Sequence, residues 1–340
     1  MEAIHRGGWS ALCVVALAAC VASSPTVAFA DTTQVRIAQQ FGVNYLPLLM
    51  MKKHQLVRKQ ARAAGLGDVQ VTWAQFGSGA AMNDALLADS LDFASGGVGP
   101  LLRIWDKSKG TIEVKGVASL GSMPLYLTTT DESVKTVADF TSKDRIALPA
   151  VKVSIQAIVL EMAAAKAFGE ANYDKLDLLT VSMRHPDAMI AMLGRGTEIT
   201  AHFANAPFQE QELASPGVHK VLSSYDVVGQ STLNSLYTTA KFHDSNPKVY
   251  RAVLAALREA IDMINRDKKA AARTYVEEEH SKLSPQFIAR ILESPDFIVT
   301  STPEGIMKYA SFMYRTKSLR HEPASWKDVY FPEIHGAPGS

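Results

Sequence analysis

Several loops of this 340-residue sequence carry residue types that could bind a small anion. Gly77-Ser78-Gly79 and Ser95-Gly96-Gly97-Val98 each follow an apolar stretch and precede a helical one. Glycine and serine at a helix start expose backbone N–H groups, and the helix dipole adds partial positive charge there. These loops indicate anion recognition, while an ordinary turn between a strand and a helix explains Gly77-Ser78-Gly79 equally well.

Three further loops occupy equivalent places after predicted strands: residues 42–45, 149–154 and 204–208. Lys152 lies in the second of them, just before a predicted helix. It could add positive charge to an anion site, or it could be a solvated lysine on the surface.

Histidines and aromatic residues give weaker signals. His202 lies in an apolar strand, where a structural or hydrogen-bonding role is the better interpretation, and His185 before Pro186 suggests helix capping. Core packing explains most aromatic residues. Tyr45, Phe203 and Phe208 are better placed to touch a ligand, although core packing explains them too.

The motifs of common enzymes and nucleotide-binding proteins are missing from the sequence. It has no Gly-x-Ser-x-Gly elbow and no His-Glu-x-x-His pair. Neither the phosphate-loop nor the dinucleotide pattern of glycines is present. We therefore expect no enzyme activity, no cofactor and no metal site.

Positioning these loops requires alternating strands and helices. Strands are expected at residues 35–38, 69–76, 91–94, 114–118, 145–148, 178–181 and 199–203, and helices at 46–64, 80–89, 101–109, 154–168, 186–193, 207–213, around 250–264 and at 305–318. Short glycine loops between them predict mostly parallel sheets with helices on both faces. The prediction is an α/β protein with two doubly wound lobes and a helical C-terminal region.

Two extended segments would connect the lobes, at residues 122–127 and 232–237. We expect the first lobe to comprise residues 31–122 and 232–340, and the second residues 123–231. Two crossings of this kind would form a hinge beside a cleft.

The first thirty residues predict export. Arg6, an apolar run over residues 11–21 and Ala28-Phe29-Ala30 fit a secretory signal peptide cleaved after Ala30. Leu17-Ala18-Ala19-Cys20 also fits a lipoprotein box, so lipid anchoring at Cys20 stays open. Cys13 and Cys20 are the only cysteines, and cleavage after Ala30 would leave none for disulfides, thiol catalysis or metal binding.

The overall composition restricts the class of protein further. The formal net charge of +1 argues against nucleic-acid binding. After the leader no stretch of 18 apolar residues predicts a membrane span. The 47% of hydrophobic residues is enough for a large core.

Taken in order, several stretches resemble the substrate-binding proteins of ABC importers in the nitrate, taurine and aliphatic-sulfonate group. The similar stretches are residues 41–48, 75–86, 91–97, 147–150 and 198–203. The resemblance implies a type II periplasmic-binding-protein fold, a periplasmic location, and partnership with a membrane permease and its cytoplasmic ATPase. We expect the protein to act as a monomer.

By position, the ligand contacts of that family would fall on ten residues. They are Asn44, Tyr45, Gln75, Ser78, Gly79, Gly97, Met123, Lys152, Val153 and Asn205. The expected ligand is a small, anionic organic molecule such as a sulfonate or carboxylate, or nitrate, held between the lobes. The shortage of arginines at strand ends favours a monoanion, or a ligand with polar and apolar parts, over a dianion.

Two other functions remain open from the sequence. A relative with this scaffold synthesises a thiamine pyrimidine with the help of lysine, histidine and cysteine residues, and the lack of cysteine after the leader argues against it here. The protein could also bind a ligand and signal to a membrane receptor, which the sequence does not distinguish from transport.

Overall fold

Two five-stranded sheets organise residues 31–340 in the computed structural model, which describes residues 1–3, 31–194 and 196–340. The predicted leader, including the cleavage site after Ala30 and the lipoprotein box at Cys20, lies outside the described residues. No helix in the described part of the chain is both long and apolar enough to cross a membrane.

The first sheet has the strand order β2-β1-β3-β10-β4. Its strands are β1 (Gln34–Gln39), β2 (Gln70–Gln75), β3 (Phe93–Gly97), β4 (Val114–Gly121) and β10 (Asn234–Thr239). β1 pairs in parallel with β2 and β3, while β10 runs antiparallel between β3 and β4. A strand from late in the chain therefore lies inside a sheet built from early ones, next to the edge strand β4.

The second sheet has the order β7-β6-β8-β5-β9. Its strands are β5 (Tyr126–Thr129), β6 (Ile146–Leu148), β7 (Thr180–Ser182), β8 (Ala201–Ala204) and β9 (His219–Ser223). β6 is parallel to β7 and β8, and β5 is antiparallel to β8 and β9. The chain passes from the first sheet to the second between β4 and β5 and returns between β9 and β10, so the predicted two-lobed α/β architecture is confirmed.

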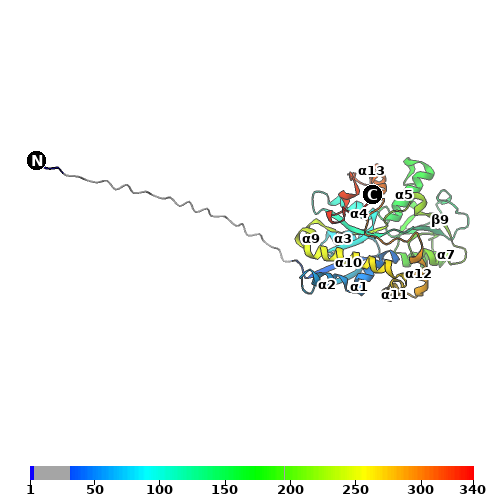
Figure 1. Ribbon diagram of the computed structural model, residues 1–340. Coiled ribbons are helices and arrows are strands. Elements are labelled where there is room, and N and C mark those ends of the chain that lie inside the picture. The colour runs from blue at the N-terminus through cyan, green and yellow to red at the C-terminus, as the bar shows by residue number, and fades with distance from the viewer. Residues whose placement is uncertain (4–30, 195) are drawn as a thin grey trace. The chain divides into compact units, whose positions relative to one another are not determined.

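Helices cover both sheets. Those of the first half of the chain are η1 (Val43–Tyr45), α1 (Leu46–Lys53), α2 (Leu56–Ala63), α3 (Gly79–Leu87), α4 (Val98–Ser108), η2 (Val137–Asp139) and α5 (Ile155–Phe168). Those of the second half are η3 (Glu170–Asn172), η4 (Asp177–Leu179), α6 (His185–Leu193), α7 (Phe208–Leu213), α8 (Ser224–Val228), α9 (Ala240–Ser245), α10 (Pro247–Arg266), α11 (Lys268–Glu278), α12 (Pro285–Glu293), α13 (Ile306–Arg315), α14 (Trp326–Val329) and η5 (Pro332–Ile334). Figure 1 shows α10 beside α1 and α2, with which it packs, and α5, α7 and β9 at the other end of the molecule.

Some predicted elements differ from the structure. The helix expected at residues 46–64 is two helices, because Gln55 adopts a left-handed conformation with φ of 51° between α1 and α2. Gly96 and Gly97 belong to β3 rather than to a loop. β9 was not predicted, because it is a partly exposed strand at the edge of its sheet whose side chains lack a clear apolar alternation.

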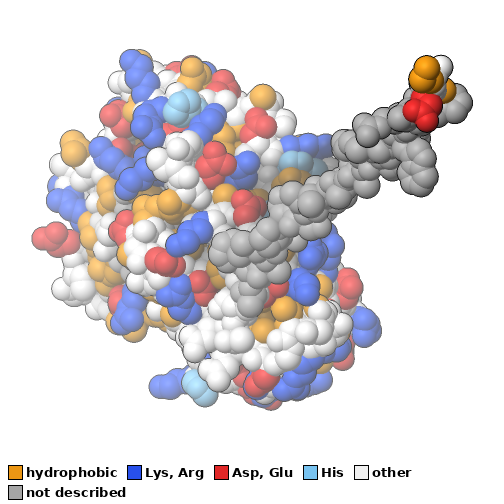
Figure 2. Space-filling model, turned by 90° about the vertical axis from the view of Figure 1, so that its left-hand side faces the viewer, with side chains coloured by type: hydrophobic (Ala, Val, Ile, Leu, Met, Phe, Trp, Pro, Cys, Tyr) orange, Lys and Arg blue, Asp and Glu red, His pale blue; other side chains and the backbone are white. Residues whose placement is uncertain are grey.

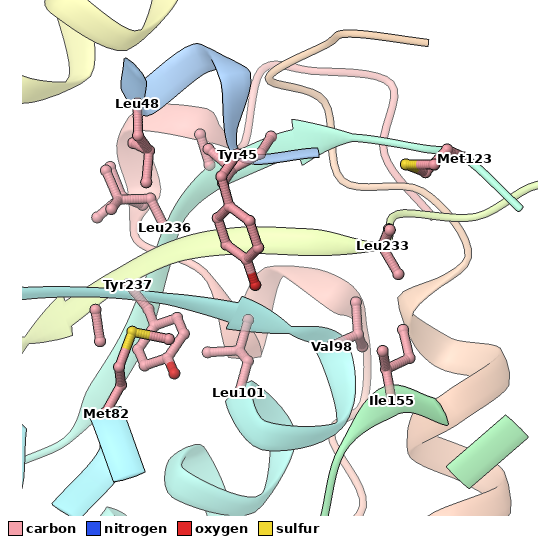
Figure 3. Close-up of a cluster of buried hydrophobic side chains, with 14 of the residues drawn as sticks. Tyr45, Leu48, Met82, Val98, Leu101, Met123, Ile155, Leu233, Leu236 and Tyr237 are labelled. Atoms are coloured by element: carbon pink, nitrogen blue, oxygen red, sulfur yellow. The ribbon is translucent and has the colours of Figure 1, made fainter. Parts of the chain in front are cut away.

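A buried apolar core extends from the first sheet to the contact between the lobes. Tyr237, Leu101, Leu236 and Val98 are fully buried in it. Figure 3 shows Ile155, at the start of α5, beside Val98. The first residue of a helix in the second lobe thus joins the core of the first lobe.

Charged side chains of both signs are interspersed over the outer surface. Figure 2 shows Lys and Arg mixed with Asp and Glu across the visible face of the described residues. This distribution agrees with the formal net charge of +1. It gives that face no extended field of one sign.

Candidate functional site

A small cavity lies between the lobe built on the first sheet and the lobe built on the second. Its volume is about 20 Å³, roughly the space that one water molecule needs. It is lined by Gln40, Asn44, Gly79, Gly97, Pro100, Leu125, Ser154, Ile155, Gln156, Asn205, Leu233 and Asn234. These residues come from both lobes and from both connecting segments, so the cavity changes whenever the lobes move apart.

Three helices begin at this cavity. Gly79 is the first residue of α3, Gly97 is the N-cap of α4, and Ile155 is the first residue of α5. The first N–H groups of a helix lack partners inside the helix and carry partial positive charge. None of the described residues that line the cavity is charged, so these helix ends supply its positive potential.

The lobes are in van der Waals contact at the cavity. A Cβ atom added to Gly97 would lie 2.7 Å from Cγ2 of Ile155, closer than real Cβ atoms approach. Ile155 has a β-branched side chain that can move little. The lobes therefore touch at a point where position 97 has no room for a side chain larger than that of glycine unless Ile155 shifts.

A series of hydrogen bonds between buried amides surrounds one side of the cavity, and we call it the amide relay. Asn205 Nδ2 donates to Asn44 Oδ1 at 3.0 Å, and Asn44 Nδ2 donates to Asn234 Oδ1 at 2.9 Å. Asn234 Nδ2 and Gln40 Nε2 both donate to the hydroxyl oxygen of Tyr45, the latter at 2.7 Å. The relay links the second lobe, the first lobe and the returning strand β10.

The direction of the amide relay is set by a backbone carbonyl. Asn205 Nδ2 also donates to the carbonyl oxygen of Phe41 at 3.1 Å, and a carbonyl oxygen can only accept. Asn205 must therefore turn its amide nitrogen toward Phe41 and Asn44. Its Oδ1 is left buried without a hydrogen-bond partner.

A second buried hydrogen-bonded series, the histidine chain, leads from the cavity into the second lobe. Gln156 Nε2 lies 3.2 Å from His185 Nε2, and His185 Nδ1 lies 2.8 Å from His202 Nε2. His202 Nδ1 lies 2.5 Å from Glu212 Oε1, and Thr128 donates to Glu212 Oε2 at 2.7 Å. If His202 donates from Nδ1 to Glu212, then His185 donates from Nδ1 to His202 Nε2, and Gln156 donates to His185 Nε2.

Burial favours the neutral form of the His185 ring, because it lowers the pKa of that ring well below its usual value. The expected hydrogen-bonding role of His202 is confirmed. The capping interpretation of His185 is wrong: its ring lies inside the lobe, stacked on Phe208 with centroids 5.7 Å apart, and the N-cap of α6 is Arg184.

Four of the ten predicted contact residues line the cavity: Asn44, Gly79, Gly97 and Asn205. Tyr45 lies one hydrogen bond behind it, in the amide relay. Its hydroxyl is buried, which raises its pKa. Whether these residues bind a ligand stays a prediction.

The other five predicted residues lie elsewhere. Gln75 Nε2 donates to Glu279, and the hydroxyl of Ser78 caps α3 by accepting from Ala81 N–H at 3.3 Å. Met123 lines a separate surface pocket beside α12. Val153 is partly buried outside the cavity lining.

Lys152 points away from the cavity. Its side chain is 63% exposed, and its Nζ lies 3.6 Å from Asp177 Oδ2. Its backbone adopts a φ of 61°. Its contribution to the contact between lobes is its carbonyl oxygen, which accepts a hydrogen bond from Arg103 Nη2 at 2.6 Å.

A buried carboxyl group lies near that contact. Glu161 on α5 is 3% exposed, and its Oε2 has no partner. Burial, with the nearby Asp177, raises its pKa to about 8, although Arg103 opposes this shift. Glu161 is therefore largely protonated at neutral pH.

Three polar lining residues were not predicted: Gln40, Gln156 and Asn234. Gln40 directly follows the first strand, where the argument from strand ends could have found it. Asn234 lies in the predicted return crossing. Gln156 had no local signal, because only the closed arrangement of the lobes brings it to the cavity.

Two α/β lobes that meet around a small cavity, with two connecting segments, define a type II periplasmic-binding-protein fold. The chain belongs to the NMT1-like family, whose model matches residues 29–277. No curated protein sequence matches it significantly.

Solved structures with the same fold cover most of the chain. The alkanesulfonate-binding protein SsuA from Xanthomonas axonopodis pv. citri is 18% identical with a TM-score of 0.67, and the match covers 88% of this chain and 99% of SsuA. The aliphatic sulphonate binding protein SsuA from Escherichia coli is 18% identical with a TM-score of 0.64, covering 88% and 92%. The nitrate-binding protein NrtA from Synechocystis PCC 6803 is 15% identical with a TM-score of 0.66, covering 90% and 86%. The predicted resemblance and fold are confirmed.

Proposed function

We propose that this protein captures a small organic molecule between its lobes and delivers it to the membrane permease of an ABC importer, which a cytoplasmic ATPase drives. The observation that carries the proposal is the cavity at three helix N-termini, whose lining comes from both lobes. A ligand that contacts both lobes stabilises the closed form over the open one. An anionic group on the ligand would face the helix ends.

Entry of a ligand requires the lobes to separate. A volume of about 20 Å³ holds no organic molecule of several heavy atoms. We propose that opening occurs about segments near residues 122 and 232, with residues 31–122 and 232–340 moving against residues 123–231. The amide relay and the Arg103 contact to Lys152 would break on opening and re-form on closure.

The sulfonate- and nitrate-binding neighbours support a role in binding rather than catalysis. We propose a monomer that acts outside the cytoplasm, without a cofactor. Retention in the membrane fraction that disappears in a Cys20→Ser variant would show that the protein is lipid-anchored, and release into the soluble periplasmic fraction would show cleavage without an anchor.

Small-angle scattering tests the closing mechanism. Native mass spectrometry of the purified protein first identifies any molecule that it carries from its host, and denaturation with refolding removes that molecule. We expect the radius of gyration of the emptied protein to decrease when the molecule is added back. An unchanged radius with every co-purified and supplied compound would contradict the proposal.

A further inference from the structure

Asn205 Oδ1 is the one side-chain atom of the described cavity lining that is buried without a hydrogen-bond partner. Asn205 is 3% exposed. Leaving a buried amide oxygen unpaired is unfavourable, and such groups in folded proteins nearly always have partners. Asn205 lines the cavity, so a molecule that enters between separated lobes meets this side chain, and a hydrogen-bond donor on that molecule would satisfy the oxygen.

Rotating the amide does not remove this requirement. A rotated Asn205 would direct Oδ1 toward the carbonyl oxygen of Phe41, which lies 3.1 Å from Nδ2. Two acceptors would then face each other. The contact with Asn44 gives no compensation, because Asn44 already uses its amide nitrogen to donate to Asn234.

The surroundings determine what kind of donor fits. No carboxylate is among the described residues that line the cavity, so an ammonium group would be buried there without a counter-charge, which is strongly unfavourable. A hydroxyl or an amide N–H is neutral and meets the amide oxygen without that penalty. An oxyanion with only acceptor atoms, such as nitrate or an alkylsulfonate, would leave Oδ1 unpaired.

We propose that the ligand is a small organic molecule whose hydroxyl or amide N–H donates to Asn205 Oδ1, and that this contact discriminates against isosteric molecules without a donor. The inference rests on the proposed function, because it assigns a chemical class to the molecule that the cavity binds. The helix N-termini would accept an anionic or carbonyl group of the same molecule, so hydroxy acids and primary amides are the favoured classes.

Matched pairs of compounds test the proposal by titration calorimetry. Suitable pairs, matched in charge and in the number of heavy atoms, are glycolate with propanoate and 2-hydroxyethanesulfonate with propane-1-sulfonate. In every pair with detectable binding, we expect the member with the donor to bind at least about tenfold more tightly, since a site built to bond a donor rejects the analogue that lacks it. Equal affinities, or tighter binding of the member without the donor, would overturn the proposal.

Two variants separate this contact from lobe closure. Asn205→Ala removes Oδ1 and should reduce the affinity ratio within a pair to about one. Asn44→Ala loses the same hydrogen bond between lobes but keeps Asn205 Oδ1 oriented by Phe41, so it should weaken both members and preserve the ratio. If a variant binds neither member of a pair, the ratio of the two affinities measured with the wild type alone tests the proposal.

The results also distinguish this inference from the proposed function. If no compound of the panel binds but native mass spectrometry finds a co-purified molecule, the groups on that molecule test the inference. A molecule without an O–H or N–H group overturns the inference and leaves the proposed function intact. If no small molecule binds at all, the proposed function fails and the inference fails with it.

Discussion

At Gly42 the backbone comes so close to the amide relay that no side chain fits. A Cβ atom there would lie 2.4 Å from Asn44 Oδ1 and 2.5 Å from Asn205 Nδ2. The residue also has a φ of 131°, which L-residues rarely adopt. Glycine at this position is therefore a condition for the bond between Asn205 and Asn44.

We predict that Gly42→Ala displaces both amides and weakens ligand binding at least tenfold, with destabilisation of about 2 kcal/mol or more from the clash and the strained backbone. Gly67→Ala is the matched control: its φ is 74°, and nothing lies within 4 Å of its added Cβ. It should be destabilised by about 1 kcal/mol and bind normally. Calorimetry and urea unfolding measure both effects, and equal binding losses would refute the steric argument.

Glu161 makes stability depend on pH at the residue scale. Its folded pKa of about 8 is above its ordinary value, so its stabilising protonated state is fully present below about pH 4.5 and is lost as pH rises through 8. We predict that, between pH 5 and pH 9, the free energy of unfolding of Glu161→Gln rises relative to that of the wild type by on the order of 3 kcal/mol. The exposed Glu198→Gln should show no such trend in urea unfolding, and parallel wild-type and Glu161→Gln curves would contradict the prediction.

At the scale of elements, the histidine chain ties β5, β8, α6 and α7 to the start of α5. Because the folded pKa of His185 is lowered, the unfolded chain binds a proton first as pH falls. The stability that the neutral ring contributes is therefore present above about pH 6.5 and decreases below it.

We predict that the wild type loses about 2 kcal/mol more stability than His185→Gln between pH 7 and pH 5. His280 is exposed, so His280→Gln provides the control. Its stability should change with pH as that of the wild type does. Unfolding in urea at each pH measures these differences, and identical pH profiles for wild type and His185→Gln would exclude His185 as their source.

Local chemistry explains which site residues the sequence could predict. Gly79 and Gly97 were found because a glycine between a strand and a helix identifies a helix N-terminus without any tertiary information. Lys152 was assigned to the site on charge and position alone, but its left-handed backbone and long side chain direct it to Asp177. Side-chain direction of this kind depends on φ and on distant partners, which spacing does not encode.

The helices and strands differ in the same way in how well the sequence predicts them. Strands and helices with clear apolar periodicity were predicted to within a few residues, as for β1 and α5. The break at Gln55 and the edge strand β9 escaped prediction because backbone strain and partial exposure leave no periodic signal. Gln156 joined the cavity only through the contact between lobes.

At the scale of the whole molecule, closure brings Gly97 against Ile155. We predict that Gly97→Ala keeps the lobes apart, because the new Cβ would lie 2.7 Å from Ile155 Cγ2. Scattering should show that Gly97→Ala with ligand has a larger radius of gyration than the wild type with ligand. The affinity of the variant for the ligand should also be lower. The double variant Gly97→Ala with Ile155→Ala should recover closure, and no recovery would place the obstruction elsewhere.

The absence of charge among the described cavity residues affects where such a protein can operate. Hydrogen bonds between neutral amides are not screened by dissolved salt, whereas pairs of exposed ions weaken as ionic strength rises. The bonds of the amide relay that form when the lobes close should therefore vary little between dilute and salty surroundings. Salt would then act on capture mainly through the attraction between an anionic ligand and the helix N-termini, and hardly through closure itself.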